Sequence, residues 1–327
     1  MARVGRRRFV IATSALLGAT IARAQQPGRR YRVGAMIGVG GDALHTYQSV
    51  LTKRLATHGF VDGRNLRIDA RGATEQFHED RETVRELLAA KPDALFTCLN
   101  RVTQAAQAAT KTVPIVFVWV WDPVVSGIVK DYAKPGGNVT GVTTRSGELL
   151  VKRLELVREL MPRAKRVAVH GLVQFQDPSL LSLLRKAAAD LGITLVEKQM
   201  GRVPGGALLD AFLREGAEVL LMLELHALQP VSGSELIRLA AAKRVPVIYA
   251  DAGAAENGGL ISYGTSLPDD MRRGADVLAR VLKGANPAEL PVEQAQRFEI
   301  VVNLKTARAL GLKIPQSVLL RADRIIE

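Results

Sequence analysis

The chain has very little cysteine. Only Cys98 occurs among 327 residues, and it lies in the apolar run Ala94–Leu99. No intrachain disulfide can form, and a thiolate zinc site, which needs several cysteines, is excluded. Aromatic residues are also scarce at 5%, and the basic residues are scattered rather than interleaved with them. Because nucleic-acid-binding proteins usually concentrate both on one surface, we expect no nucleic-acid partner.

Catalytic sequence motifs are absent as well. The chain contains no G-x-S-x-G nucleophile turn and no G-x-x-x-x-G-K-[ST] phosphate loop. The five histidines show neither the H-E-x-x-H spacing nor another metal-binding spacing. The sequence therefore predicts neither an enzyme nor a resident metal ion or cofactor.

The amino terminus carries the pattern of a cleavable export signal. Four arginines, three of them at Arg6–Arg8, precede the apolar stretch Phe9–Ile21, which is followed by Ala22-Arg23-Ala24. The stretch is too short to span a bilayer, and the small residues that flank Arg23 suit a signal peptidase. We expect residues 1–24 to be a signal peptide, and Arg6–Val10 resembles the twin-arginine export pattern. The predicted location is the periplasm.

Removal of this segment changes the charge of the chain. It holds five of the 45 basic residues and no acidic residue, so 40 basic residues remain against 32 acidic ones, a net charge of +8. A solvated basic surface of this size mildly favours an anionic ligand or membrane surface. No cysteine stands directly after the expected cleavage site, so we expect no lipid anchor. We also expect no membrane-spanning segment in the exported chain.

From residue 30 onward, short runs rich in Val and Ile alternate with amphipathic stretches, one of them at 269–283. This alternation is typical of βαβ units in which helices cover both faces of a parallel sheet, and it predicts a doubly wound, Rossmann-like α/β fold. We expect strands at 31–38, 65–71, 94–99 and 114–120, then at 165–170, 193–198, 218–224 and 245–250, and later at 258–264 and 298–303.

The first eight predicted strands form two sets that read as copies of one pattern. Val33 corresponds to Val167 at an offset of 134 positions, and Pro114 corresponds to Pro246 at an offset of 132. A matched order at a nearly constant offset predicts two similar lobes. The elements after Tyr249 would complete both sheets, which requires the chain to cross between the lobes more than once.

The turn Gly38-Val39-Gly40-Gly41-Asp42-Ala43 has the G-x-G-x-x-A form between a strand and a helix. Such a turn binds dinucleotides when an acidic residue about 20 positions further on holds the ribose. The nearest candidate, Asp69, lies 29 positions beyond Gly40. An exported NAD(P)-dependent oxidoreductase that uses Gly38, Gly40 and Ala43 is therefore the alternative. The preferred interpretation is a turn whose backbone amides suit a carboxylate or another anion.

Ligand-binding residues are expected where the strands end, because open α/β sheets bind ligands beyond the carboxyl ends of their strands. Asp122 or Glu224 suits an ammonium group, and Trp121 or Phe175 suits an apolar side chain. Since Trp119 and Trp121 lie on the same side of an alternating strand pattern, we expect one of them in the core. An amino acid or related carboxylate would use such a set. The candidates are Gly40, Gly41, Asn100, Thr103, Trp121, Asp122, His170, Gln174, Phe175, Glu224, His226 and Asp251.

Several runs resemble one family of transport proteins. Asp122–Val129, followed by Lys134–Gly141, is similar to the DPVxSGLV…xPGGNVTG signature of ABC-transporter substrate-binding proteins, which include the tryptophan/tyrosine type. The carboxyl-terminal runs that resemble the same family are Gly258–Gly264, Arg280–Pro287, Leu290–Glu293, Phe298–Ala307 and Ala309–Asp323.

The resemblance implies a periplasmic-binding-protein fold of type I with three crossings between the lobes, two of them at 136–143 and 258–264. It implies capture of a small ligand for an ABC importer, with a permease in the inner membrane as partner and no chemistry on the ligand. A ligand-sensing module for a membrane receptor is a further alternative, and we expect a monomer. Lobe I would comprise residues 30–143 and 264–297, and lobe II residues 144–263 and 298–327.

Two departures from the family pattern fall at the predicted binding edge. The chain has Trp121 where relatives often have glycine, and Gly171–Phe175 where they often have an Asn-Pro pair. The resemblance therefore does not fix the ligand.

Overall fold

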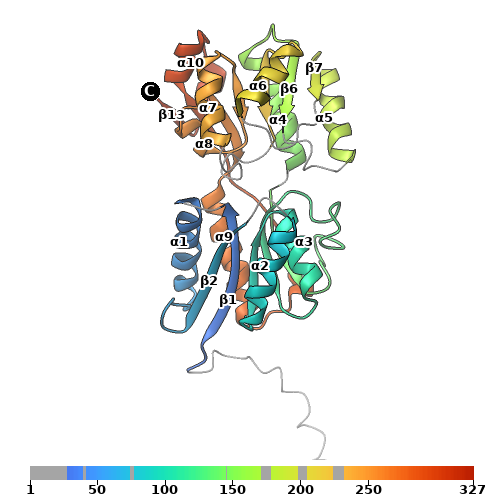
Figure 1. Ribbon diagram of the computed structural model, residues 1–327, viewed down its shortest axis with the longest axis vertical. Helices are drawn as coiled ribbons and strands as arrows, with labels where there is room; N and C mark the ends of the chain where they lie inside the picture. The colour runs from blue at the N-terminus through green and yellow to red at the C-terminus, as the bar shows by residue number, and fades with distance from the viewer. Residues whose placement is uncertain are drawn as a thin grey trace, which may run out of the picture.

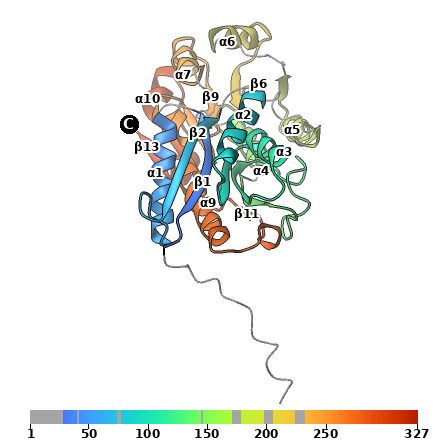
Figure 2. The same cartoon turned by 60° about the horizontal axis from the view of Figure 1, so that its bottom comes forward.

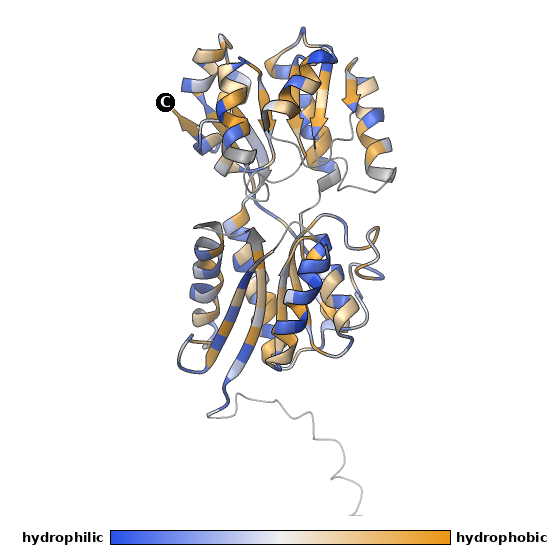
Figure 3. Cartoon of the chain, in the orientation of Figure 1, coloured by the Kyte–Doolittle hydropathy of each residue, from blue (hydrophilic) through white to orange (hydrophobic). Residues whose placement is uncertain are grey.

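The protein is described by a computed structural model that covers residues 28–39, 42–73, 77–144, 146–170, 178–197, 205–223 and 232–327. Two α/β lobes lie one above the other in Figure 1, each built around its own mostly parallel sheet. The apolar strands form the interior of both lobes, and the helices turn their hydrophilic faces outward (Figure 3). The predicted α/β fold with two Rossmann-like lobes is confirmed.

Lobe I contains a six-stranded sheet in the order β11-β5-β4-β3-β1-β2. Helices α1 and α9 pack together on one face (Figure 2), and α2 and α3 pack together on the other. Strands β3 and β4 are buried along their whole length, as expected for apolar runs covered on both faces. The strands are β1 (Tyr31–Val39), β2 (Leu66–Ala73), β3 (Ala94–Cys98), β4 (Ile115–Val120), β5 (Val139–Thr143) and β11 (Glu293–Gln294), and the helices are α1 (Asp42–Thr57), α2 (Phe77–Ala89), α3 (Asn100–Ala109), α9 (Leu267–Leu282) and the short 3₁₀ helix η2 (Pro287–Glu289).

Lobe II contains a seven-stranded sheet in the order β13-β12-β10-β9-β8-β6-β7. Its strands are β6 (Arg166–His170), β7 (Thr194–Glu197), β8 (Val219–Met222), β9 (Val247–Tyr249), β10 (Ile261–Thr265), β12 (Phe298–Asn303) and β13 (Arg324–Ile326). Its helices are α4 (Ser146–Leu160), α5 (Pro178–Asp190), α6 (Gly205–Arg214), α7 (Ser232–Ala242), α8 (Ala252–Glu256), α10 (Leu304–Leu310) and α11 (Gln316–Arg321).

The two sheets repeat one strand order. Lobe I has β5-β4-β3-β1-β2, and lobe II has β10-β9-β8-β6-β7 in the same relative positions. The internal offset in the sequence therefore reflects a duplicated arrangement of strands. The copies differ at one end, because β11 runs parallel to β5 whereas β12 runs antiparallel to β10.

Each strand predicted from the sequence is present, and the amphipathic stretch at 269–283 forms helix α9. Strands β5, β11 and β13 were not predicted. Strand β5 contains Gly141, which weakens a strand pattern, but the structure explains this residue. A Cβ at Gly141 would lie 2.1 Å from the carbonyl oxygen of Phe117, so only glycine fits beside β4.

The chain crosses between the lobes after β5, after β10 and between β11 and β12. The segments 136–143 and 258–264, which the resemblance implied as crossings, instead contain buried strand residues, and the chain crosses just after β5 and β10. The crossings run side by side: Ser266 N–H donates to the Arg297 carbonyl at 3.0 Å, and Ala295 N–H donates to the Thr143 carbonyl at 2.8 Å. They form one compact connection between the lobes.

Candidate functional site

The carboxyl ends of the parallel strands β1 to β5 and β6 to β10 point toward the other lobe (Figure 1), whereas β12 and β13 run in the opposite direction. Two contacts join the lobes along this boundary. Trp121, which follows β4 in lobe I, packs against the apolar core of lobe II. Tyr47 of α1 lies close enough to Asp251 of lobe II for that carboxylate to raise the pKa of its hydroxyl, after the larger effect of burial. Residues at opposed strand ends are therefore neighbours across the boundary.

Six of the twelve candidates lie outside the described residues. They are Gly40, Gly41, Gln174, Phe175, Glu224 and His226.

Asn100 begins helix α3 at the end of β3, directly after Leu99, whose φ of 72° is rare for a branched side chain. Its Oδ1 accepts a hydrogen bond from the backbone N–H of Trp121 at 3.0 Å. That bond fixes the amide, and it leaves the Nδ2 group buried without a hydrogen-bond acceptor. Asn100 therefore joins the ends of β3 and β4 and retains a donor that none of the described residues satisfies.

Trp119 is the core tryptophan of the pair, with 3% of its surface exposed. Its ring meets Tyr47 edge-on, with 4.9 Å between ring centroids. Its φ of 57° coincides with a shift in the β4–β5 register, so a local bulge re-aims the side chain. The indole Nε1 group is buried and has no hydrogen-bond acceptor. The end of β4 thus carries a second unsatisfied donor. The ring of Tyr47, which packs on Trp119, lies at the lobe boundary.

Thr103 and Asp122 are engaged within lobe I. Thr103 is fully buried, and its hydroxyl donates to the Leu99 carbonyl at 2.8 Å and lies 2.9 Å from the Thr97 hydroxyl. Asp122 Oδ1 accepts two backbone N–H bonds, each 3.0 Å long, from the turn that follows it. The Tyr132 hydroxyl also donates to this oxygen at 3.0 Å. Both side chains hold the local turns in place.

In lobe II, Asp251 follows β9 and precedes α8, and it is 2% exposed. The neighbouring cation is Arg153 of α4, a residue that sequence reasoning did not select. Arg153 is 4% exposed, and its Nε donates to the Tyr263 carbonyl at 2.7 Å. Burial lowers the pKa of its guanidinium to about 10, while Asp251 acts in the opposite direction. The helical spacing does offer a signal, because Arg153 lies between Leu149 and Leu156 on the apolar face of α4, whereas its basic neighbour Lys152 is exposed.

His170 ends β6 and packs edge-on near Phe212, with 6.4 Å between ring centroids. Burial lowers its pKa to about 4, so the ring is neutral at neutral pH. His170 therefore suits a hydrogen bond to a ligand better than an ion pair.

The pH dependence of stability should report this burial. An unfolded histidine titrates near pH 6.5, so the contribution of His170 is complete above that pH and is lost as the pH falls toward 4. We expect His170→Gln to reduce the wild-type loss of stability between pH 7 and pH 5 by about 1–2 kcal/mol. Urea denaturation of both proteins at pH 7 and pH 5 measures this difference. Equal losses of stability in wild type and His170→Gln would contradict the prediction.

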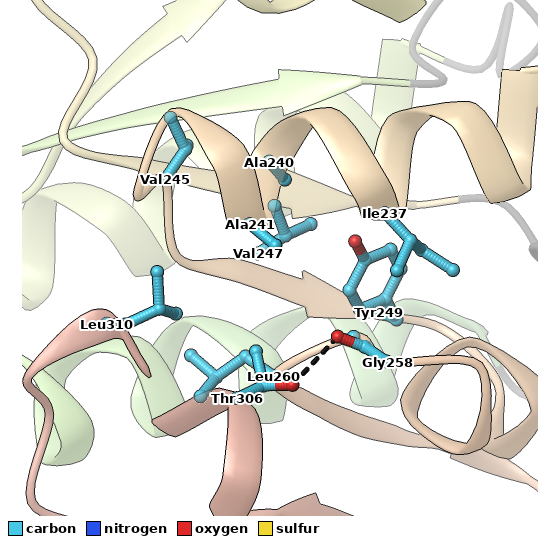
Figure 4. A pocket seen from close by; sticks show the side chains of 11 residues that line it. Ile237, Ala240, Ala241, Val245, Val247, Tyr249, Gly258, Leu260, Thr306 and Leu310 are labelled. Carbon is cyan, nitrogen blue, oxygen red and sulfur yellow. Dashed lines mark hydrogen bonds between the residues drawn. The ribbon is translucent and has the colours of Figure 1, made fainter. Parts of the chain in front are cut away.

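A small apolar pocket lies within lobe II, between α7, β9 and the start of α10 (Figure 4). The Thr306 hydroxyl donates to the Gly258 carbonyl at its rim, at 2.9 Å. Its free volume of about 10 Å³ is close to that of one water molecule, so it does not suit an organic solute.

Within the parts of the chain that the structure describes, no group of three or more His, Cys, Asp or Glu side chains could hold a metal ion. No helix in these same parts is long and apolar enough to cross a membrane.

The position of Asp69 weighs against a dinucleotide site. Asp69 pairs in register with Gly34, five residues before β1 ends at Val39, which is about 16 Å along the strand. Its carboxylate also forms an ion pair with Arg67, at 3.0 Å. An acid that binds ribose would instead stand at the carboxyl end of β2. The dinucleotide alternative is therefore not favoured.

Two similar parallel-sheet lobes, three adjacent crossings and polar groups at opposed strand ends define the class of two-lobed solute-binding proteins. Residues 32–326 match the family of ABC transporter substrate binding proteins, and the chain belongs to that family. The sequence-based assignment to this family is confirmed, and with it the role of a solute-binding protein. The family is one of binding proteins and not of enzymes.

Relatives and solved structures agree with this assignment. The chain is 27% identical over 263 residues to a tyrosine-binding protein of Clostridioides difficile, which covers 80% of this chain and 75% of that one. A conserved domain protein of Vibrio cholerae is 30% identical, with a TM-score of 0.80, and covers 91% of this chain and 100% of its own. A Streptococcus pneumoniae ABC domain in complex with L-Trp has the same coverage, 24% identity and a TM-score of 0.77.

Proposed function

We propose that this chain captures an amino acid or a related carboxylate between its two lobes and delivers it to an inner-membrane permease. Residues 1–24 would direct the chain to the periplasm, where it would act as a monomer without chemistry on the ligand. The family supports the binding role, and relatives named for tyrosine or bound to L-Trp support an amino-acid ligand.

The observation that carries the ligand class is the pair of unsatisfied donors at the end of β3 and β4. Asn100 Nδ2 and Trp119 Nε1 are buried and lack acceptors in the part of the chain that the structure describes. A buried donor without an acceptor costs about 1–3 kcal/mol, so such groups need a physical reason. A carboxylate supplies only acceptors, and its two oxygens can satisfy two donors. The +8 charge of the chain beyond residue 24 also favours an anionic group.

The direct test is calorimetry of the purified protein against the twenty amino acids and a panel of small carboxylates. We expect binding of L-tryptophan, L-tyrosine or another member of the panel, with a rise in melting temperature in excess ligand. The matching amides, such as tryptophanamide, should bind at least about tenfold more weakly, because they lack the carboxylate. A full panel without any binding would contradict the proposed function.

The donors can be removed one at a time. Trp119→Phe keeps an aromatic side chain but loses the N–H together with the five-membered ring of the indole, so we expect about tenfold weaker binding of the carboxylate ligand and a loss of stability from the smaller core side chain. Asn100→Asp keeps an Oδ acceptor for the Trp121 N–H and replaces the donor with a negative charge, so its loss of affinity should be larger. Asn257→Asp is the matched control, because Asn257 is exposed in lobe II. If both site variants bind like this control, the two donors do not contact the ligand.

A further inference from the structure

A buried carboxyl group stands at the connection between the lobes. Asp270 lies in the first turn of α9, the helix that begins directly after β10 and the return crossing to lobe I. It is 1% exposed, and among the described residues neither of its carboxylate oxygens has a hydrogen bond that meets ordinary geometry. Burial of a carboxylate without such partners costs free energy, so burial stabilises the neutral form of this group relative to the ionised form.

Asp270 belongs to lobe I, but its surroundings come from both lobes. Its backbone N–H donates to the Ser266 carbonyl at 2.9 Å, and the Ser266 N–H binds the Arg297 carbonyl of the third crossing. Strand residues Gly264 and Glu299 are paired beside it in lobe II. A hinge rotation between the lobes would therefore change what surrounds this carboxyl group.

The charged groups around Asp270 reinforce the effect of burial. Burial is the largest factor that raises its pKa, to about 7, and Asp269 of α9 and Glu299 of β12 raise it further. Thr265 and Arg273 act in the opposite direction. Arg273 donates to Glu293 through Nη2 at 2.7 Å, while its buried Nε has no hydrogen-bond partner among the described residues. Strands β4 and β5, which pack beneath α9, carry no titratable side chains, and β3, which also contacts α9, carries the buried Cys98.

Helix α1 also packs on α9, but its charged contacts lie further along the helix. Arg54 and His58 both pair with Asp276, six residues beyond Asp270, at 2.7 and 2.6 Å. Asp269, for its part, has a cationic partner in Arg272 at 3.3 Å.

We propose that Asp270 makes the lobe hinge responsive to protons. The neutral carboxyl group favours the lobe arrangement of Figure 1, and the carboxylate favours an arrangement in which Asp270 gains water. The sign follows from burial: the present arrangement binds the proton more tightly, so acid conditions stabilise it and alkaline conditions favour its alternative. This inference needs no particular ligand and does not depend on the proposed transport role.

The distance between the lobes tests the proposal in the ligand-free protein. Arg238 in lobe II and Glu289 in lobe I are exposed, so Arg238→Cys and Glu289→Cys provide sites for a donor and an acceptor dye. The natural Cys98 is buried and should not react. We expect the energy transfer to change between pH 5 and pH 9 at constant ionic strength, with a midpoint at or below pH 7 in the otherwise wild-type protein, because the alternative arrangement has the lower pKa.

Two variants assign the transition. Asp270→Asn should abolish it and keep the acid-side distance at every pH. Glu299→Gln removes a neighbouring negative charge and should move the midpoint to lower pH, and it keeps the proposal testable if Asp270→Asn fails to fold. His58→Gln is the control, because it removes the histidine that pairs with Asp276 of α9, and it should leave the midpoint unchanged. A pH-independent distance, or a midpoint unmoved by Glu299→Gln, would overturn the proposal.

Discussion

Gly264→Ala is expected to destabilise the protein by about 4 kcal/mol, because β10 passes so close to the backbone of Ala250 that no side chain fits at this position. A Cβ on Gly264 would lie 1.7 Å from the carbonyl oxygen of Ala250 and 2.9 Å from its carbonyl carbon. Both atoms belong to the backbone, so the clash can be relieved only by moving β10 and the crossing that follows it. The melting temperature should fall by roughly 8–16 °C.

The matched control is Gly206→Ala in helix α6. A Cβ there would meet Leu239 Cδ1 at 3.4 Å, an ordinary contact, and alanine is a better helix former than glycine. We expect Gly206→Ala to leave stability unchanged or to raise it by about 0.5–1 kcal/mol. Thermal and urea unfolding of the two variants provide the comparison. Equal stabilities would show that β10 does not lie as close to Ala250 as described.

Arg153→Met is expected to lower the free energy of unfolding by about 3 kcal/mol at neutral pH. It removes a buried positive charge that interacts with the Tyr263 carbonyl and with Asp251. The Tyr263 carbonyl loses its donor, and Asp251 loses the positive charge next to it.

Arg153→Lys separates charge from geometry. Lysine retains the positive charge but lacks the planar group that reaches the Tyr263 and Ala250 carbonyls at 2.7 and 3.4 Å. We expect a loss of stability between those of wild type and Arg153→Met, measured by urea unfolding at pH 7. A methionine variant as stable as wild type at pH 7 would show that the buried cation is not needed.

The sequence predicts most of the fold because the relevant signals are local. Continuous apolar runs identify the buried strands, and the offset between Val33 and Val167 identifies the duplication that the two strand orders confirm. Strand β5 is the instructive exception. Gly141 interrupts the apolar strand pattern of β5. The close approach of Phe117, 24 positions away in the sequence, explains why glycine is needed there.

The site is less predictable because its side chains are defined by long-range contacts. Asn100 was selected for its position at a strand end, but its unsatisfied amide becomes visible only through its bond to Trp121. The sequence places one of Trp119 and Trp121 in the core without saying which, and the structure shows that it is Trp119, whose left-handed φ and buried indole N–H could not be predicted. Arg153 and Asp270 sit on ordinary amphipathic helices, and the sequence does not show that each is enclosed by another part of the chain.

The return of the chain to lobe I through α9 has a consequence for the order of biosynthesis. Helix α9 buries Met271, Ala275 and Leu278 in the core of lobe I, against α1 and β4. These residues emerge from the ribosome more than a hundred positions after β5. Lobe I therefore cannot complete its core when its amino-terminal part has just been synthesised. One face of its sheet lacks α9 until almost the whole polypeptide has been synthesised.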